Sequence, residues 1–413
     1  MDEWEGRLRV GMFTNVYLPT TNGVVVSVET FRKALTRLGH DVFIFGPDVG
    51  DIVDRAPFIF RYPALELPMQ KYPLTLPVSP FIDHLLKRNL KPHVLHANHP
   101  ALLGRVAEKK SEELNLPLVF TYHTRYADYS HYAEPLPQDQ VKEFIDQWLS
   151  VFMAKCHHIV VPSNSIRELL EKKHGMTEHV SVVPTGVELE KFSRYEKGEA
   201  RELLGWDSGD KVLVSVGRLA KEKSFDLLLD AFSRLQDKSV RLVIIGSGDE
   251  ARTLKRMAES LGVDERVEFT GLIPFDKVPL YLAASDFFAF ASITETQGLV
   301  TLEALAAGCP VVAVDASGTR EAVDDTCSVL TEHDAEALAV AIDEMMGRGD
   351  WGALSEAARK RAGEFGSLRQ GEAMVEVYQK AMEAHKAGIH ALPRKERVRQ
   401  NWLEYLKAFK VWD

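Results

Sequence analysis

Cysteine is scarce in this chain, and long apolar runs are missing from it. The three cysteines, Cys156, Cys309 and Cys327, are far apart and odd in number, without paired spacing. We therefore expect buried, reduced thiols in a cytoplasmic protein, and neither a disulfide nor a metal site. The most apolar stretch, 278–293, is interrupted by a Ser-Asp pair and falls short of the roughly 18 residues that a membrane-spanning helix needs. The acidic first residues also lack the apolar core of a signal peptide.

Several catalytic signatures are absent as well. The sequence contains no Walker-type lysine loop, no His-Glu-x-x-His, no Gly-x-Ser-x-Gly and no Asp-x-Asp metal clamp. The formal net charge of −10 argues against general nucleic-acid binding. The hypotheses that these signatures would support are therefore set aside.

What the chain does contain is enough apolar material for two domains. Its 413 residues are 45% hydrophobic and 27% charged, the balance of an ordinary soluble globular protein. Short apolar runs alternate with amphipathic segments, such as the one from Val24 to Leu38 that Gly39 would cap. This alternation predicts mostly parallel, doubly wound α/β sheets. The expected strands are 8–13, 41–45, 94–96, 118–121, 158–161, 180–183, 211–216, 242–245, 267–270, 286–290 and 310–314.

The alternation restarts after a Pro/Gly break at Pro184–Val187. We predict an N-terminal Rossmann-like domain over 1–186 and a second over 187–368, followed by a helix and a tail of different character over 369–413. Ligands of open α/β sheets bind at the carboxyl ends of the strands. Two such sheets facing one cleft predict a two-lobed enzyme that acts on a nucleotide-bearing substrate.

Two glutamates eight residues apart form the strongest candidate site. Glu295 ends the loop after the expected 286–290 strand, and Glu303 lies inside the helix that Gly298 opens. The amino terminus of this helix would present N–H groups to a phosphate or diphosphate. Glu303 could accept hydrogen bonds from a ribose diol, and Glu295 could hold sugar hydroxyls. A single glutamate in so apolar a helix is costly unless it has a partner, which favours a functional role over a solvated one.

Two cations and one glycine offer further contacts for phosphate. Arg218 and Lys223 flank the turn after the expected 211–216 strand, where positive charge suits a leaving diphosphate. Gly23 precedes a helix and would let the backbone approach a phosphate closely. Surface charge and an ordinary loop glycine are the plain alternatives.

The segment Gly246–Ala251 fits a degenerate dinucleotide fingerprint, with Glu265 and Glu268 about 20 residues further on. No comparable Gly-x-Gly follows the first strand of either half. We interpret Gly248 as part of a turn near the nucleotide and keep an NAD-dependent oxidoreductase as the alternative of another class.

Tyrosines and histidines crowd the segment from Thr121 to Tyr132. His123 follows the expected 118–121 strand, which would bring it into the predicted cleft. A lone histidine is more often structural, but one at the carboxyl end of a strand beside tyrosine and arginine is a better site candidate.

These motifs resemble those of the large family of retaining, nucleotide-sugar-dependent glycosyltransferases with two Rossmann-like domains, the GT-B architecture. The resemblance covers about residues 7–384 and rests on Glu295 and Glu303, Gly217-Arg218, Glu222-Lys223, the hinge Pro184–Val187 and the loop Thr20–Gly23. It implies an acceptor-binding N-terminal domain, a donor-binding second domain, and a C-terminal helix that crosses back to the first.

The resemblance also implies a role for each residue. His123, Glu295, Arg218 and Lys223 would be catalytic. The donor would be bound by Gly23, Arg218, Lys223, Gly248, Glu295, Gln297, Gly298, Leu299, Val300 and Glu303, and the acceptor by Tyr122, Arg125 and Tyr126. No metal would be needed, because the two cations and the helix dipole would stabilise the leaving diphosphate. Transfer would retain configuration by front-face substitution, with lobe closure assembling the site.

Within this family, Thr121–Tyr132 and Thr294–Val300 resemble the bacterial diacylglycerol glucosyltransferases. This implies UDP-glucose as donor and membrane diacylglycerol as acceptor. The tail 386–413 adds support, because seven basic and three acidic residues with an aromatic stripe predict an anchor on an anionic membrane surface. The same stripe could instead pack onto the N-terminal domain, and 81–91 is a second, weaker basic amphipathic segment. We expect a cytoplasmic protein, peripheral at the inner face of the plasma membrane.

Other hypotheses remain open at this point. The acceptor could be soluble, such as a sugar phosphate, a glycerate or a sugar, and a non-catalytic binding protein is a further alternative. The sequence does not separate UDP-glucose from UDP-galactose or GDP-mannose. It also leaves the number of transferred sugars and the oligomeric state undetermined.

Overall fold

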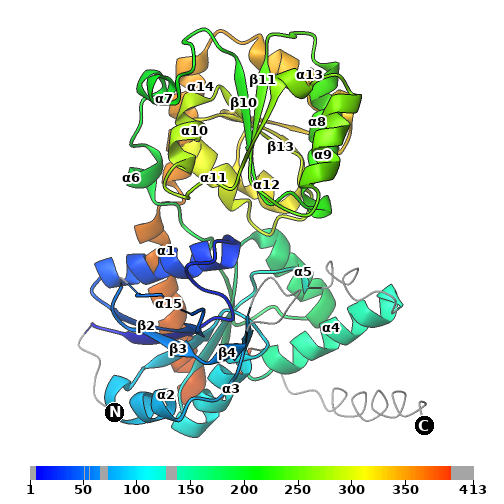
Figure 1. Cartoon of the computed structure of the whole chain (residues 1–413). Helices are drawn as coiled ribbons and strands as arrows, with labels where there is room; N and C mark the ends of the chain where they lie inside the picture. Colours follow the sequence, from blue (N-terminus) through cyan, green and yellow to red (C-terminus); the bar gives the residue numbers. More distant parts are fainter. Residues whose placement is uncertain (1–5, 51, 55, 66–72, 127–136, 392–413) are drawn as a thin grey trace. The chain divides into compact units, whose positions relative to one another are not determined.

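The computed structural model describes residues 6–50, 52–54, 56–65, 73–126 and 137–391. The chain divides into two compact units (Figure 1). The first consists of Met1–Val183 together with Gly371–Asp413, and the second of Pro184–Gln370. The divisions fall after Val183 and after Gln370, and 371–413, most of the segment that the sequence analysis set apart as 369–413, is grouped with the first unit.

A parallel sheet of seven strands, counted within the described residues, forms the first unit. Its order is β3-β2-β1-β6-β7-β8-β9, so the chain runs outward from β1 to β3, returns beside β1 at β6 and runs outward again to β9. The direction therefore switches between β1 and β6. The strands are β1 (Arg9–Phe13), β2 (Asp41–Pro47), β3 (Ile59–Tyr62), β6 (Val94–Ala97), β7 (Leu118–Thr121), β8 (His158–Val161) and β9 (Val180–Val182), with a small separate pair, β4 (Ala64–Leu65) and β5 (Leu74–Thr75).

Helices cover both faces of this sheet, because alternate side chains of each strand are apolar and buried. Val10 and Ile44 belong to the cluster under α1 (Gly23–Arg37) and the second half of α15 (Ser367–Lys386). Leu95 and Phe120 belong to the opposite cluster, which includes residues of α3 (Leu103–Leu114), α4 (Gln138–Met153) and α5 (Asn164–His174). The shorter helices are α2 (Pro80–Leu85) and the π-helix η1 (Leu86–Leu90).

The second unit repeats the same path with a six-stranded parallel sheet within the described residues. Its order is β12-β11-β10-β13-β14-β15, so the direction switches between β10 and β13. The strands are β10 (Val212–Val216), β11 (Arg241–Ile245), β12 (Val267–Gly271), β13 (Phe287–Phe290), β14 (Val311–Val314) and β15 (Ser328–Thr331).

Two helical layers enclose this second sheet (Figure 1). Leu213 and Leu242 face the layer of α8 (Phe225–Arg234), α9 (Ala251–Ser260) and α13 (Ala335–Met346). Val214 and Val243 face the layer of α10 (Val278–Ala284), α11 (Leu299–Ala306) and α14 (Trp351–Gly363). The remaining helices are α6 (Leu189–Phe192), α7 (Lys197–Leu204), η3 (Lys221–Lys223), η4 (Asp264–Arg266) and α12 (Ser317–Ala322).

The predicted fold class is confirmed, including the crossing C-terminal helix. Helix α15 starts in the second unit and continues into the first, where Tyr378 is buried and its hydroxyl is 2.9 Å from His96 Nδ1. Each expected strand is present, but β3, β15 and the two-residue strands β4 and β5 were not expected. Strands β3 and β15 are edge strands of four residues that are only partly buried, so neither shows the continuous apolar run of a central strand.

Two expectations about absent features can be compared with the described residues. Among them, no helix has the length and apolar character required to cross a bilayer. All three cysteines are free thiols in buried positions.

Candidate functional site

The carboxyl ends of β10 and β13 gather most of the residues singled out in the second unit. These neighbouring strands flank the switch point of the sheet, where ligands of open α/β sheets bind. Arg218 follows β10, and the loop 291–298 that carries Glu295 follows β13. The fold therefore brings two motifs that are distant in sequence to one edge of one sheet.

An ion pair joins these two motifs. Lys223 Nζ donates to Glu295 Oε1, and Ser292 Oγ donates to the same oxygen at 3.0 Å. The side chain of Glu295 is only 14% exposed, so the lysine compensates a carboxylate that has lost much of its hydration. The carboxylate is thereby held in one place and keeps acceptor sites for a hydroxyl ligand.

A second ion pair lies in the same turn. Arg218 donates to Glu222, whose side chain is 9% exposed, and the carbonyl oxygen of Glu222 lies 3.3 Å from Ser292 Oγ as a second, longer acceptor for the same hydroxyl. Both cations of the predicted diphosphate site are thus matched by a carboxylate, which the sequence did not show. A guanidinium has five N–H donors and an ammonium three, so each can serve a carboxylate and a phosphate together.

Glu303 is buried in α11, eight residues after Glu295. Burial raises its pKa to about 8, an effect that Lys191 partly offsets and Glu188 reinforces. Lys191 and Glu188 were missed by the sequence analysis, although they follow the predicted hinge directly. A buried carboxyl that is largely protonated near neutral pH would be a hydrogen-bond partner for vicinal hydroxyls in either protonation state.

The start of α11 is shaped for close approach. Gly298 has φ 74°, a conformation that favours glycine, and it offers no side chain to cap the helix. The first-turn N–H groups, which include those of Leu299 and Val300, therefore lie at the end of a helix dipole. This geometry suits an anion, as expected from the sequence.

The side chain of Gln297 holds the beginning of the second unit. Its Nε2 donates to the carbonyl oxygen of Thr185 and its Oε1 accepts from the Thr185 N–H, both at 2.7 Å. The side chain is therefore engaged with the hinge segment, and only the backbone of Gln297 remains for the predicted donor contact. Nothing in the sequence pattern indicates this pairing across 112 residues.

The glycines of the segment Gly246–Ala251 have a packing explanation. A Cβ atom at Gly246 would lie 1.8 Å from the Gly217 carbonyl oxygen, and one at Gly248 would lie 2.2 Å from the Leu219 carbonyl oxygen. The turn after β11 thus packs against the backbone that follows β10. The Gly-x-Gly spacing is required by this contact, without a dinucleotide.

In the first unit, His123 lies beside the ends of β6 and β7. Its Nε2 is 2.9 Å from Asn98 Oδ1, and Asn98 follows β6 directly. Burial, together with His99 and His96, lowers the pKa of His123 well below its usual value. His123 is therefore a neutral imidazole at neutral pH. The sequence predicted His123 but not Asn98.

The other predicted residues of the first unit are less clearly placed for ligand binding. Gly23 is the first residue of α1, whose cap Asn22 accepts from Val25 N–H at 2.9 Å. Tyr122 is buried in the core and makes edge contacts with Phe120 and Tyr126. Tyr126 and Arg125 are only partly exposed. A direct acceptor contact for Tyr122 would require the core to open, and the acceptor roles of the three residues stay predictions.

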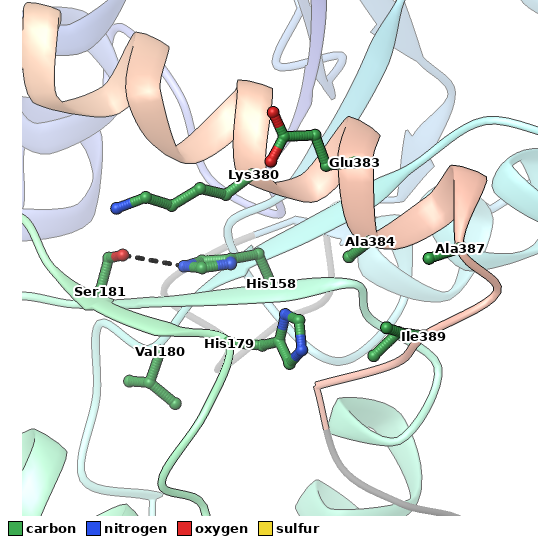
Figure 2. Close-up of a pocket in the computed structure, with 9 residues that line it drawn as sticks. All are labelled: His158, His179, Val180, Ser181, Lys380, Glu383, Ala384, Ala387 and Ile389. Carbon is green, nitrogen blue, oxygen red and sulfur yellow. Dashed lines mark hydrogen bonds between the residues drawn. The ribbon is translucent and has the colours of Figure 1, made fainter.

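A pocket of ≈ 470 Å³ lies elsewhere in the first unit, between β9 and α15 (Figure 2). His158 and His179 stand at the amino ends of β8 and β9, with His158 Nε2 2.9 Å from Ser181 Oγ, while Lys380 and Glu383 come from α15. The amino ends of the strands lie opposite to the carboxyl ends, where the ligands of open α/β sheets bind. None of the predicted site residues lines the pocket, although Ala387 and Ile389 belong to the segment 386–413.

Two further expectations, on the tail and on metal binding, are not tested by these contacts. Almost all of the basic aromatic tail, 392–413, lies outside the described residues. Among the residues that are described, no cluster of three or more His, Cys, Asp or Glu could hold a metal ion. The expectation that no metal is needed stays a prediction.

Comparisons with known proteins agree with this geometry. Residues 196–364 match the family model "Glycosyl transferases group 1", and residues 21–191 match "Glycosyltransferase Family 4". The alpha-monoglucosyldiacylglycerol synthase of Streptococcus pneumoniae is 32% identical, with 74% of this chain and 71% of that protein covered. The synthase of the same name from Acholeplasma laidlawii is 30% identical, with 74% and 80% covered. The D-inositol 3-phosphate glycosyltransferase of Mycolicibacterium smegmatis is 30% identical, with 71% and 68% covered.

Solved structures show the same fold at lower identity. Sucrose-phosphate synthase from Thermosynechococcus elongatus superposes with a TM-score of 0.76 at 22% identity, covering 91% of this chain and 99% of that one. HepE from Anabaena in complex with UDP-glucose gives 0.70 at 19% identity, covering 90% and 99%. The nicotinamide-dependent alternative is not supported. With two Rossmann-like units and paired acids and cations at the second switch point, the chain belongs to the GT-B glycosyltransferases of group 1.

Proposed function

We propose that this protein transfers glucose from UDP-glucose, with retention and hence in α configuration, to a hydroxyl of membrane diacylglycerol. The observation that carries the acceptor is the identity of 30–32% with two alpha-monoglucosyldiacylglycerol synthases, each aligned to 74% of this chain. The ion-paired edge after β10 and β13 supports the donor chemistry.

The proposed donor site uses the contacts of the second unit. Arg218, Lys223 and the first turn of α11 would bind the diphosphate, while Glu303 would bind the ribose hydroxyls. Glu295, held by Lys223, would accept from sugar hydroxyls. These charges are fixed before the substrate arrives, so little reorganisation would be needed as negative charge develops on the leaving group.

The proposed step needs no enzymic nucleophile. The bond between the anomeric carbon and the diphosphate oxygen breaks, and the acceptor oxygen bonds to the same face of that carbon. The acceptor proton passes to the departing diphosphate oxygen, so atoms and charges balance. His123 would act near the anomeric centre. A metal ion would not be required, and activity that survives complete chelation of divalent cations would support that part of the proposal.

Two segments of the chain support a membrane acceptor. The tail 386–413 is basic and aromatic in sequence, although almost all of it lies outside the described residues. Within the described part, Val78 and Phe81, the latter in α2, are each 67% exposed, and η1 carries Lys87 and Arg88 directly after α2. Exposed apolar side chains beside cations suit an anionic lipid interface.

The test is a donor and acceptor panel with the full chain. Vesicles of diacylglycerol and anionic phospholipid are incubated with UDP-glucose, UDP-galactose or GDP-mannose, and the lipids are analysed by mass spectrometry and by α-glucosidase digestion. We expect an α-hexosyl diacylglycerol from UDP-glucose. We also expect Glu295→Ala to lose most transfer while keeping the fold, whereas Glu332→Ala, exposed in the same unit, should keep both. Product formed only on a soluble acceptor would refute the lipid proposal.

A second candidate has the same donor chemistry and a soluble acceptor. It is favoured by the 30% identity with a D-inositol 3-phosphate glycosyltransferase. Vesicle flotation separates the two candidates, because only the lipid enzyme should float with anionic vesicles. Truncation after Ala391 should then reduce flotation.

A further inference from the structure

Two side chains of β6 and its extension reach the end of β7. His96 Nε2 is 2.6 Å from Thr121 Oγ1, and Asn98 Oδ1 is 2.9 Å from His123 Nε2. Residues 96 and 98 are two positions apart, as expected for side chains that point to the same face of an extended chain. Tyr378 on α15 fixes His96 from its other ring nitrogen at 2.9 Å. The ring of His123 is thus attached to a rigid part of the sheet.

The orientation of the Asn98 amide is set by its other contacts. Its backbone N–H donates to the Phe13 carbonyl oxygen at 2.9 Å, and its Nδ2 lies 3.4 Å from the same oxygen. A carbonyl oxygen accepts only, so Nδ2 must be the end of the amide that faces Phe13. Oδ1 therefore faces His123, and Asn98 is only 3% exposed.

The direction of this hydrogen bond fixes the proton on His123. An amide oxygen cannot donate, so His123 Nε2 carries the hydrogen. In a neutral imidazole the other nitrogen, Nδ1, then holds the lone pair. Among the described residues, His96 on β6 and His99 in the loop after it act against protonation of His123.

We propose that Asn98 is a positioning residue that holds the ring of His123 as the Nε2–H tautomer, so that the neutral ring carries its lone pair on Nδ1. The tautomer stands on the hydrogen bonds alone, and its use in transfer rests on the proposed function. In transfer, a neutral ring is compatible with an oxocarbenium-like centre, which an imidazolium would repel.

The structure explains why an amide suits this position better than a carboxylate. An aspartate in place of Asn98 would accept from Nε2–H equally well, but its negative charge would raise the pKa of His123 by about 1–3 units. The ring would then protonate closer to neutral pH. Asn98→Asp therefore changes the charge of this side chain at nearly constant shape. If Asn98 were only structural, the substitution would not introduce a new pH-dependent step in the activity.

The experiment combines activity and spectroscopy on the full chain. For Asn98→Asp we expect a kcat profile with a new loss on the acid side, shifted by about 1–3 pH units toward neutrality, and recovery at higher pH. For Asn98→Ala we expect kcat to fall about 10- to 100-fold, the usual range for an orienting group, with a smaller change in donor KM. Gln236→Glu is the matched control, because it makes the same change from amide to carboxylate at an exposed position in the second unit. Its pH profile should keep the wild-type shape.

The tautomer is measured independently by ¹⁵N NMR of ring-labelled histidine, with His123→Asn to assign the signals. We expect a pyrrole-type Nε2 and a pyridine-type Nδ1 for His123 in the wild type. A reversed pattern, or an Asn98→Asp profile identical to that of the wild type, would overturn the proposal. If no donor is turned over at all, the proposed function fails while the NMR result still decides the tautomer.

Discussion

The two units share one strand path but carry different ionisable groups. In both, the chain runs outward from a central strand, returns beside it and runs outward again. Of the 14 histidines, however, only His333 lies in Pro184–Gln370. The second unit instead places two carboxylate–cation pairs and a buried glutamate around its switch point.

This difference teaches that a common fold leaves the chemistry of its edges open. In the first unit, burial lowers the pKa of seven described histidines: His40, His96, His99, His123, His157, His158 and His174. One chain of bonds runs from Leu118 N–H to His157 Nδ1, and from His157 Nε2 to His385 Nδ1 at 3.0 Å. The charged pairs of the second unit are better suited to an anionic ligand. If this difference matters, changes of pH and single substitutions should affect the two units separately.

Acid should affect the first unit most strongly. Burial lowers the pKa of His96 to about 3 and the pKa values of His99, His157 and His158 to about 4. The unfolded chain therefore binds protons before the folded one, and stability is lost as pH falls from about 6.5 toward 4, by roughly 1–3 kcal/mol for each group. Urea unfolding at several pH values, followed by hydrogen-exchange mass spectrometry, should show the first unit opening first.

A matched pair of variants sharpens this acid prediction. His158→Phe removes one depressed titration and should make the stability of the first unit less dependent on pH. His333→Phe, in the second unit, should leave that dependence unchanged. Simultaneous loss of protection in both units at every pH would contradict the separation.

Breaking the Lys223–Glu295 pair should have the next largest effect. Lys223→Met removes a donor for the proposed leaving group, and transfer should fall about 100- to 1000-fold. It also leaves Glu295 partly buried without its cation, so the melting temperature should fall. The double variant Lys223→Met/Glu295→Gln should regain stability but not transfer, while Lys221→Met, exposed in the same turn, should behave as wild type. Recovery of transfer in the double variant would show that the pair is only structural.

Glu303 should give the smallest effect, with the opposite pH dependence. Its pKa is raised to about 8, so the folded state holds a proton that the unfolded chain has released above about 4.5. The stability of the second unit should therefore fall by a few kcal/mol as pH rises from about 4.5 to about 8. Glu303→Gln should remove the decline, as measured by urea unfolding between pH 5 and about 9. An unchanged slope would show that the carboxyl is not the titrating group.

Much of the fold could be predicted from local pattern. Central strands such as β10 and β13 are short apolar runs that predict buried parallel strands, and Gly39 follows the end of α1 as expected. The partly buried edge strands β3 and β15 were not predicted, because their side chains mix polar and apolar types. In the site, Glu295 and Glu303 were identified by spacing, whereas Lys191 and Glu188 carry no signal beyond their nearness to the hinge.

The sequence by itself determined the two α/β units, the edge of each sheet where a ligand would bind, and the residue types available there, because these follow from short-range periodicity and chain order. Only the tertiary structure decided how those residues pair. The contacts Lys223–Glu295, Gln297–Thr185 and Asn98–His123 join positions 72, 112 and 25 residues apart. Such pairs form because buried polar groups must find partners wherever the packed sheets place them, and local sequence does not encode that distance.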